Sequence, residues 1–183
     1  GVTAYSPLSQ TLLNNFLAGN INFVATGAEG GISNTILVAG KNLNGTPANV
    51  AYSIDWTQVN INLAVSNAVI NGSNNTLNPL YYTQDGINAL QQVASTVGVQ
   101  AIQAGLALGQ VVTTSLDSNT FISNVDAGLY AGNFVINAIP FNIYVAEYPA
   151  NYANQVYGGF QVAYTPQYGF QTIVFNVVVS QFA

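Results

Sequence analysis

The sequence has 183 residues, of which 50% are hydrophobic and only 4% charged, and its net charge is −5 at pH 7. With one basic residue, no histidine and no cysteine, it lacks the basic patch of a nucleic-acid-binding protein, a disulfide framework and the usual metal ligands. We therefore predict no nucleic-acid partner, no metal and no cofactor. No apolar run approaches the roughly 18 to 20 residues of a membrane-spanning helix, so no span is expected.

The polar residues are mostly Asn, Gln, Ser and Thr, whose side chains hydrate a surface without titrating. Acid would neutralise the six carboxylates near their ordinary pKa of about 4, and only Lys41 and the amino terminus would stay charged. Such a chain escapes the charge repulsion that unfolds most proteins in acid. The composition favours an acidic extracellular location, and the start at Gly1 indicates a removed signal peptide. A viral or cell-surface protein of neutral surroundings that merely lacks charge is the alternative.

Residues 1–19 are expected to form a separate N-terminal tail. Their strand-like start is broken by Pro7 and followed by an apolar cluster from Leu12 to Leu17. From Asn20 the pattern is that of short strands bounded by Gly, Asn or Pro, as in INFVAT, SNTILVAG and NVAYSIDW. Residues 58–65 alternate between apolar and polar, which predicts a half-buried strand, and Asn71-Gly72 then signals a tight turn.

One amphipathic helix is expected near residues 85–109, where Asp85 precedes apolar residues at spacings of three and four. Gly98, Gly105 and Gly109 weaken its second half, so we expect it to break or fray there. Six more strands are predicted in VVTTSL, TFISNV, LYAGNFVINAI, FNIYVAEY, YGGFQVAYT and QTIVFNVVVSQF. The sequence thus predicts a mainly-β head domain over residues 20–183, a pilin-like or Ig-like sandwich or a jelly roll with one inserted helix.

The sequence offers little for catalysis, and we expect that the protein is not an enzyme. Asp117 and Asp126 are the closest pair of carboxylates between predicted strands, and Asp126-Ala127-Gly128 faintly resembles the catalytic triplet of aspartic peptidases. A match of three residues is common by chance. Asp117 and Asp126, like Glu29 and Glu147, fit better as turn residues beside Asn, Gly or Pro.

Three features point to surface chemistry. The sequons at Asn44, Asn71 and Asn74 fall in predicted turns and predict N-linked glycans, although about three such triplets arise by chance in an Asn-rich chain. Lys41 is either a solvated loop lysine or one half of an intramolecular isopeptide bond. The Tyr-rich segment over residues 148–170 is either a surface for other subunits or carbohydrate, or ordinary strand packing.

Assembly is the function that these features favour. In a filament subunit, an exposed sheet edge can be completed by a segment of the neighbouring subunit. Residues 1–19 are the candidate donor strand, in which Val2, Ala4, Leu8 and Leu12 would fill pockets of the next subunit. The alternative is that this segment packs on its own domain.

Almost uncharged, cysteine-free segments such as VNINLAV and TIVFNVVVSQF, with loop sequons such as NGSNNT, resemble the secreted pilins of thermoacidophilic archaea, among them the subunit of the Sulfolobus surface thread. The resemblance covers most of the chain but includes no diagnostic motif. It implies an N-glycosylated extracellular filament of identical subunits, joined head to tail by donor-strand complementation, for adhesion to cells or surfaces or for biofilm.

The helix from Asp85 departs from a pure pilin sandwich, and it leaves open a biofilm-matrix fibre in which helices accompany a jelly roll. Two further hypotheses are compatible with the sequence. One is a jelly-roll virion coat protein of an acid-spring virus, and the second is an acid-active β-sandwich peptidase.

Overall fold

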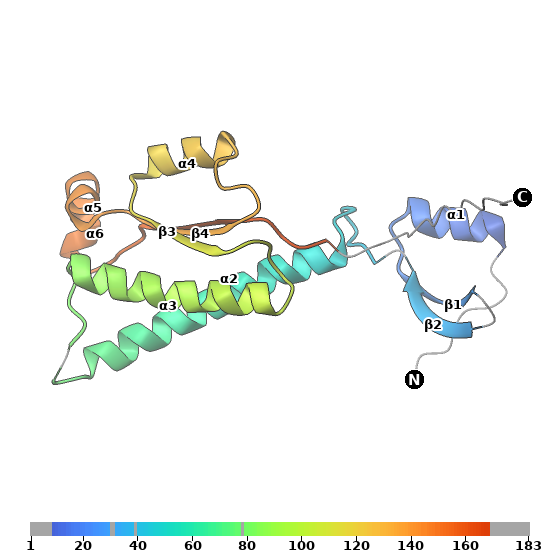
Figure 1. The fold of residues 1–183 in the computed structure, drawn as a ribbon, viewed down its shortest axis with the longest axis horizontal. Coiled ribbons are helices and arrows are strands. Elements are labelled where there is room, and N and C mark those ends of the chain that lie inside the picture. The colour runs from blue at the N-terminus through green and yellow to red at the C-terminus, as the bar shows by residue number, and fades with distance from the viewer. Residues whose placement is uncertain (1–8, 30–31, 39, 78, 169–183) are drawn as a thin grey trace, which may run out of the picture.

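The computed structural model of the chain describes residues 9–29, 32–38, 40–77 and 79–168. These residues form a small N-terminal part and a larger helix-and-sheet body, which follow one another end to end along the long axis of the molecule (Figure 1).

The N-terminal part consists of one helix and one β-hairpin. Helix α1 (Gln10–Ala18) begins after Ser9, whose hydroxyl accepts a hydrogen bond from the backbone N–H of Leu12. Strands β1 (Phe23–Glu29) and β2 (Ile32–Val38) pair antiparallel, with Phe23 opposite Val38 and Glu29 opposite Ile32. The rings of Phe16 and Phe23, with centroids 5.4 Å apart, hold the helix to the hairpin.

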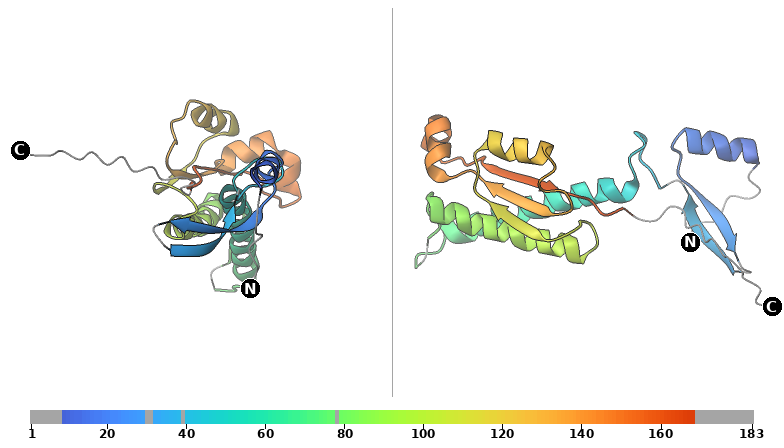
Figure 2. Two further views of the ribbon diagram at one scale, coloured as in Figure 1. Left: turned by 90° about the vertical axis from the view of Figure 1, so that its right-hand side faces the viewer. Right: turned by 45° about the horizontal axis from the view of Figure 1, so that its top comes forward.

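The body has three layers. The long helices α2 (Ala48–Ser73) and α3 (Gln84–Gln103) pack against each other, and α3 covers one face of a three-stranded sheet (Figure 2). The sheet has the order β3-β4-β5: β3 (Val111–Thr114) runs parallel to the central β4 (Phe134–Ala138), and β5 (Phe160–Tyr164) runs antiparallel to it. Helix α4 (Ser118–Asp126) lies over the opposite face, and the short helices α5 (Phe141–Glu147) and α6 (Pro149–Ala153) lie at one end.

The core sits between α3 and the sheet. Every residue of β4 is buried, and because side chains alternate along a strand, Phe134 and Ile136 share one face. They pack against Ala94 and Ala101 of α3, and Trp56 of α2 packs onto the same cluster. On the other face of the sheet, the side chain of Asn137 ties β4 to the segment that leads into α4.

Gly98 does not break α3, so the expected break near this residue is wrong; the helix ends before Gly105, in agreement with the alternative that it frays before Val111. A Cβ at this position would lie 2.9 Å from a ring carbon of Phe134 and 3.1 Å from a methyl group of Val111. The missing side chain therefore lets the helix approach the sheet closely, and the packing offsets the low helix propensity of glycine. The predicted helix near 85–109 is present, but it ends at Gln103.

The predicted mainly-β sandwich or jelly roll is wrong. About half of the structure is helical, and the body contains a small sheet of three strands in the described part of the chain. The strands predicted in INFVAT, SNTILVAG, VVTTSL, LYAGNFVINAI and YGGFQVAYT are present. The segments NVAYSIDW, TFISNV and FNIYVAEY instead form parts of α2, α4 and α5. The strand predicted in QTIVFNVVVSQF lies outside the described residues.

The half-buried strand predicted over residues 58–65 lies within α2. The prediction placed Val59, Ile61, Leu63 and Val65 on one buried face, whereas in the helix Ile61 and Val65 pack against the core and Val59 and Leu63 are exposed. Small polar side chains also occupy buried positions on the inward face of α2. Ser53 and Thr57 are buried there, and the Ser53 hydroxyl donates to the carbonyl oxygen of Leu106 at 2.9 Å. Their spacing of four residues belongs to a helix, while the alternation of Val59 and Leu63 with polar neighbours does not describe the buried face.

Candidate assembly surfaces

The β1–β2 hairpin has unpaired edges. Within the described residues neither strand pairs with a third one, and the hairpin has no extensive contact with the body. A two-stranded hairpin is at best marginally stable in water, because three or more strands or a packed helix are needed for independent stability. Helix α1 supplies part of that support, although none of its described residues is buried. The hairpin therefore offers two edges to which an additional strand can be joined by main-chain hydrogen bonds.

A hydrogen-bonded loop, residues 40–47, joins the hairpin to α2. The side chain of Asn22 bonds the backbone of Lys41 in both directions, with its amide donating to the Lys41 carbonyl at 2.7 Å and its oxygen accepting from the Lys41 N–H at 2.9 Å. The Asn20 amide donates to the carbonyl oxygen of Leu43, whose side chain is 93% exposed. The loop thus presents an apolar side chain on a backbone that is held by side chains from the segment preceding β1, at the same end of the hairpin.

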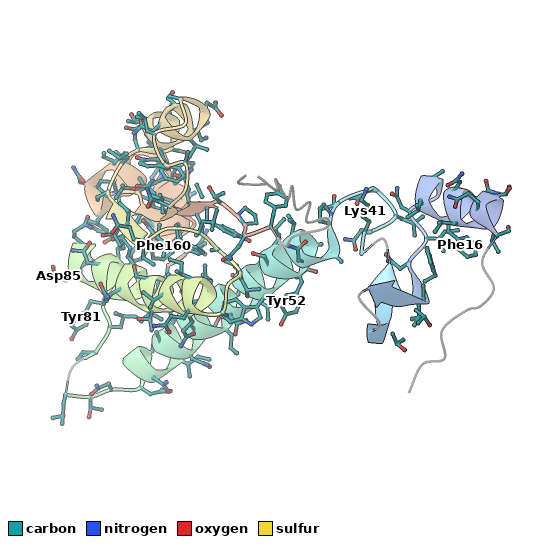
Figure 3. The ribbon with its side chains drawn as sticks, turned by 45° about the vertical axis from the view of Figure 1, so that its right-hand side comes forward. Phe16, Lys41, Tyr52, Tyr81, Asp85 and Phe160 are labelled. Atoms are coloured by element: carbon teal, nitrogen blue, oxygen red, sulfur yellow. The ribbon has the colours of Figure 1, made fainter. Side chains whose placement is uncertain are left out.

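A groove of about 720 Å³ opens at the far end of the body, between the second half of α2, the start of α3 and α6. We call it the aromatic groove, and its aromatic lining consists of Tyr81, Tyr82, Tyr152, Tyr157 and Phe160. Tyr81 and Phe160 are labelled in Figure 3. None of the described side chains that line it is charged, so it is suited to apolar or aromatic groups.

Two hydroxyl groups of the aromatic groove are already used within the fold. Tyr82 donates to the carbonyl oxygen of Val156 at 2.9 Å, and Tyr157 donates to that of Ile139 at 2.6 Å. Burial, with the neighbouring Tyr82 and Tyr144, raises the pKa of Tyr157 far above its ordinary value. These tyrosines are therefore mainly packing residues.

Three of the five tyrosines in the Tyr-rich segment are exposed. Tyr148, Tyr152 and Tyr168 each keep more than a third of their surface exposed. Tyr148 and Tyr152 also pack on other rings, Tyr148 on Tyr144 and Tyr152 on Tyr82 and Phe141. Packing and surface exposure, the two interpretations of this segment, are therefore combined in the same residues.

The candidate catalytic carboxylates are not brought together. Asp117 is the N-cap of α4 and Asp126 is its last residue, so about 13 Å of helix separates them. The Asp117 carboxylate accepts from the backbone N–H and hydroxyl of Thr120, and these hydrogen bonds lower its pKa. Glu147 ends α5 and is exposed, and Glu29 ends β1. The described residues contain no group of three or more metal-ligating side chains.

Asn44 lies in a turn as predicted, whereas other predicted glycosylation and donor residues lie in settings different from those expected. Asn44 is in loop 40–47, where its side-chain oxygen accepts from the Thr46 N–H at 3.0 Å. Asn71 lies inside α2 and not in a turn, and Asn74 is the C-cap of that helix; all three asparagines are exposed. Leu12 lies in α1, so it is helical and not extended here.

The remaining predicted donor residues, Val2, Ala4 and Leu8, lie outside the described residues. Lys41 forms no ion pair within the described part of the chain, and its backbone bonds to Asn22 do not test an isopeptide bond at its side chain. None of the described helices has the length and apolar character required to span a bilayer.

No family model matches the sequence, and no curated protein and no solved structure is significantly similar to it. Function must therefore be inferred from the surfaces described above. Sequence reasoning missed the aromatic groove, because its lining comes from segments that are far apart in the chain. It also missed the exposed apolar side chains of α2, such as Val59 and Leu63, which a helical interpretation of residues 48–73 would have placed on one face.

Proposed function

We propose that the chain is a structural subunit of an extracellular filament of identical copies, and that it is not an enzyme. The observation that carries the proposal is the β1–β2 hairpin, which stands beside the body with both edges unpaired among the described residues. Long unpaired edges are a liability that proteins normally cover, so an edge of this kind calls for a strand from another copy.

The neutral surface supports this proposal. The chain carries one basic and six acidic residues, so identical copies bring little charge repulsion into a contact. The polar surface is made of amides and hydroxyls, which suits an acidic exterior because it keeps its hydration at any pH. Adhesion and biofilm matrix are the two roles that such a filament would serve, and N-linked glycans at Asn44, Asn71 and Asn74 would lie on its surface.

The donor in this proposal is residues 1–8, which precede α1. The donor predicted from the sequence extends to Leu12, but a residue within a helix does not add to a sheet edge. Val2, Ala4 and Leu8 remain the side chains that would enter the neighbouring subunit. In an extended strand Val2, Ala4 and Leu8 share one face, and the main chain supplies the hydrogen bonds to β1 or β2.

Electron microscopy of the purified chain tests the proposal directly. We expect continuous fibres for the full chain and none after deletion of residues 1–8, with the circular-dichroism spectrum of the body unchanged. An excess of a synthetic peptide of residues 1–8 should cap the acceptor edge and stop elongation, while a scrambled peptide of the same composition should not.

Several outcomes would contradict parts of the proposal. Closed shells in place of fibres would favour a coat protein. Fibres that survive deletion of residues 1–8 but not of residues 169–183 would transfer the donor role to the other end of the chain. Proteolysis at low pH that is lost on changing Asp126 or Glu147 to the amide would overturn the non-enzymatic assignment.

A further inference from the structure

Helix α2 carries large apolar side chains on its outer face, away from the core. Its outer stripe consists of Tyr52, Val59, Leu63 and Ile70, which are 59%, 62%, 56% and 58% exposed. At 100° per residue these four positions fall within about 40° of one another around the helix. Figure 3 shows Tyr52 on the outer side of α2, away from the sheet. Besides the buried Ser53 and Thr57, the inner face of α2 carries Ile61 and Val65, which pack against the core. A helix with large apolar side chains on both faces is normally covered on both, so this stripe is expected to be covered in the assembled protein.

The spacing of the stripe fits another helix. Its residues follow one another at intervals of seven, four and seven, so they occupy four of the six positions of a heptad seam between two helices. The two intervening positions are held by Trp56, which packs on the core, and Ser66. From Tyr52 to Ile70 the seam is about 27 Å long. Helix α2 contains no basic residue, so it lacks the cationic flank by which amphipathic helices bind anionic lipid surfaces.

The structure assigns this stripe as a contact with the α2 helix of a second copy, packed antiparallel. In that arrangement Tyr52 of one copy faces Ile70 of the other and Val59 faces Leu63, so large and medium side chains meet along the whole seam. The contact goes beyond the proposed end-to-end joining, because it pairs the bodies of two subunits through identical surfaces related by a two-fold axis.

The single charge of α2 selects the direction of packing. Asp55 borders the stripe, and a parallel pair would bring the two Asp55 carboxylates to the same level with no cation on either helix to offset them. The antiparallel pair places the two carboxylates about 18 Å apart along the axis. It also brings each Asp55 beside Ser66 of the other copy, which borders the stripe on the same side and whose exposed hydroxyl can donate to the carboxylate.

The seam is shorter than that of a permanent dimer. Stable interfaces bury about 800 Å² on each partner, more than a single stripe of four side chains supplies. We therefore expect a weak, concentration-dependent dimer for isolated chains. Where a filament aligns many copies, the same contact would be repeated and would hold neighbouring filaments together by multivalency.

The test uses cysteine cross-linking, since the natural chain contains no cysteine. Full chains carrying Tyr52→Cys are mixed with full chains carrying Ile70→Cys and oxidised. The expected result is a disulfide-linked pair of the two variants and no such pair from Tyr52→Cys alone, because antiparallel packing holds the two copies of residue 52 about 27 Å apart. Links between two copies of Tyr52→Cys, or no links in the mixture, would overturn the inference.

Sedimentation equilibrium supplies a second measurement with a matched control. Leu63→Gln should weaken the dimer by about tenfold, because it removes a central apolar contact. Ile54→Gln changes an equally apolar, 47% exposed residue of the same helix outside the stripe, and it should change the dissociation constant less than about twofold. Equal effects of the two variants would contradict the assigned seam. Deletion of residues 1–8 should abolish fibres and leave this dimer intact, so the two proposals fail separately.

Discussion

Replacement of Asn137 by leucine, which has a similar size, should destabilise the body strongly. The Asn137 side chain is fully buried and makes four hydrogen bonds. Its amide donates to the carbonyl oxygen of Leu116 at 3.0 Å and to the side-chain oxygen of Gln161 at 2.9 Å, and its oxygen accepts from the Thr114 hydroxyl at 3.0 Å and the Leu116 N–H at 2.8 Å. These bonds join β4 to β3, to β5 and to the segment before α4.

Each bond contributes about 1 kcal/mol net, and the loss of all four also leaves the backbone groups of Leu116 without these partners. Burial of a leucine side chain returns about 1.5 to 3 kcal/mol at best, and less where the cavity is shaped for an amide. We expect the free energy of unfolding to fall by about 2 to 4 kcal/mol. Urea denaturation followed by the fluorescence of Trp56, the single tryptophan, measures this change.

Asn119→Leu is the matched control, because Asn119 lies exposed in the first turn of α4. Its effect should stay within about 0.5 kcal/mol. A loss below about 1 kcal/mol for Asn137→Leu would refute the reasoning, since it would mean that the buried network contributes no more than one ordinary hydrogen bond.

Three further predictions concern packing and pH. Gly98→Val should cost about 1 to 3 kcal/mol in urea denaturation, because its side chain must displace Phe134; a stabilised variant would contradict the close helix–sheet contact. The pKa of Tyr157 is raised in the folded state, so the neutral phenol stabilises the fold fully below about pH 10, and this contribution is lost as the pH rises further. The melting temperature should therefore fall above about pH 10, and it should fall less steeply in Tyr157→Phe. The lowered pKa of Asp117 means that its carboxylate stabilises the fold above about pH 4, and this contribution is lost as the pH falls through the folded-state pKa. Asp117→Asn should therefore weaken the dependence of the melting temperature on pH between about pH 5 and 2. An unchanged slope would argue against the hydrogen bonds from Thr120 to the Asp117 carboxylate.

The sequence prediction is right for the helices and strands that are specified by a few neighbouring residues. Asp85 and the spacing of Ile87, Leu90 and Ala94 predict α3, and β4 is recognisable from FVINA because a central strand is apolar nearly throughout. The Phe, Ile and Val content of α4 and α5 is typical of strands, which is why the sequence prediction for these two helices is wrong. Asp117 and Pro140, which stand at the starts of these helices, are the signals against that interpretation.

Amino-acid composition alone determines the properties that do not depend on where residues lie in the fold, such as the number of titratable groups. A chain with seven charged side chains, no histidine and no cysteine has few groups that titrate between acid and neutral pH, whatever its fold. Which face of α2 is buried, in contrast, depends on the elements that pack against the helix in the folded body. Ser53 and Thr57 are buried and Ile61 and Val65 pack against the core, whereas Val59 and Leu63, which are as apolar and as large, are left on the outside. Burial follows the shape of the neighbouring surface as well as hydrophobicity, and that shape is set by segments distant in the chain.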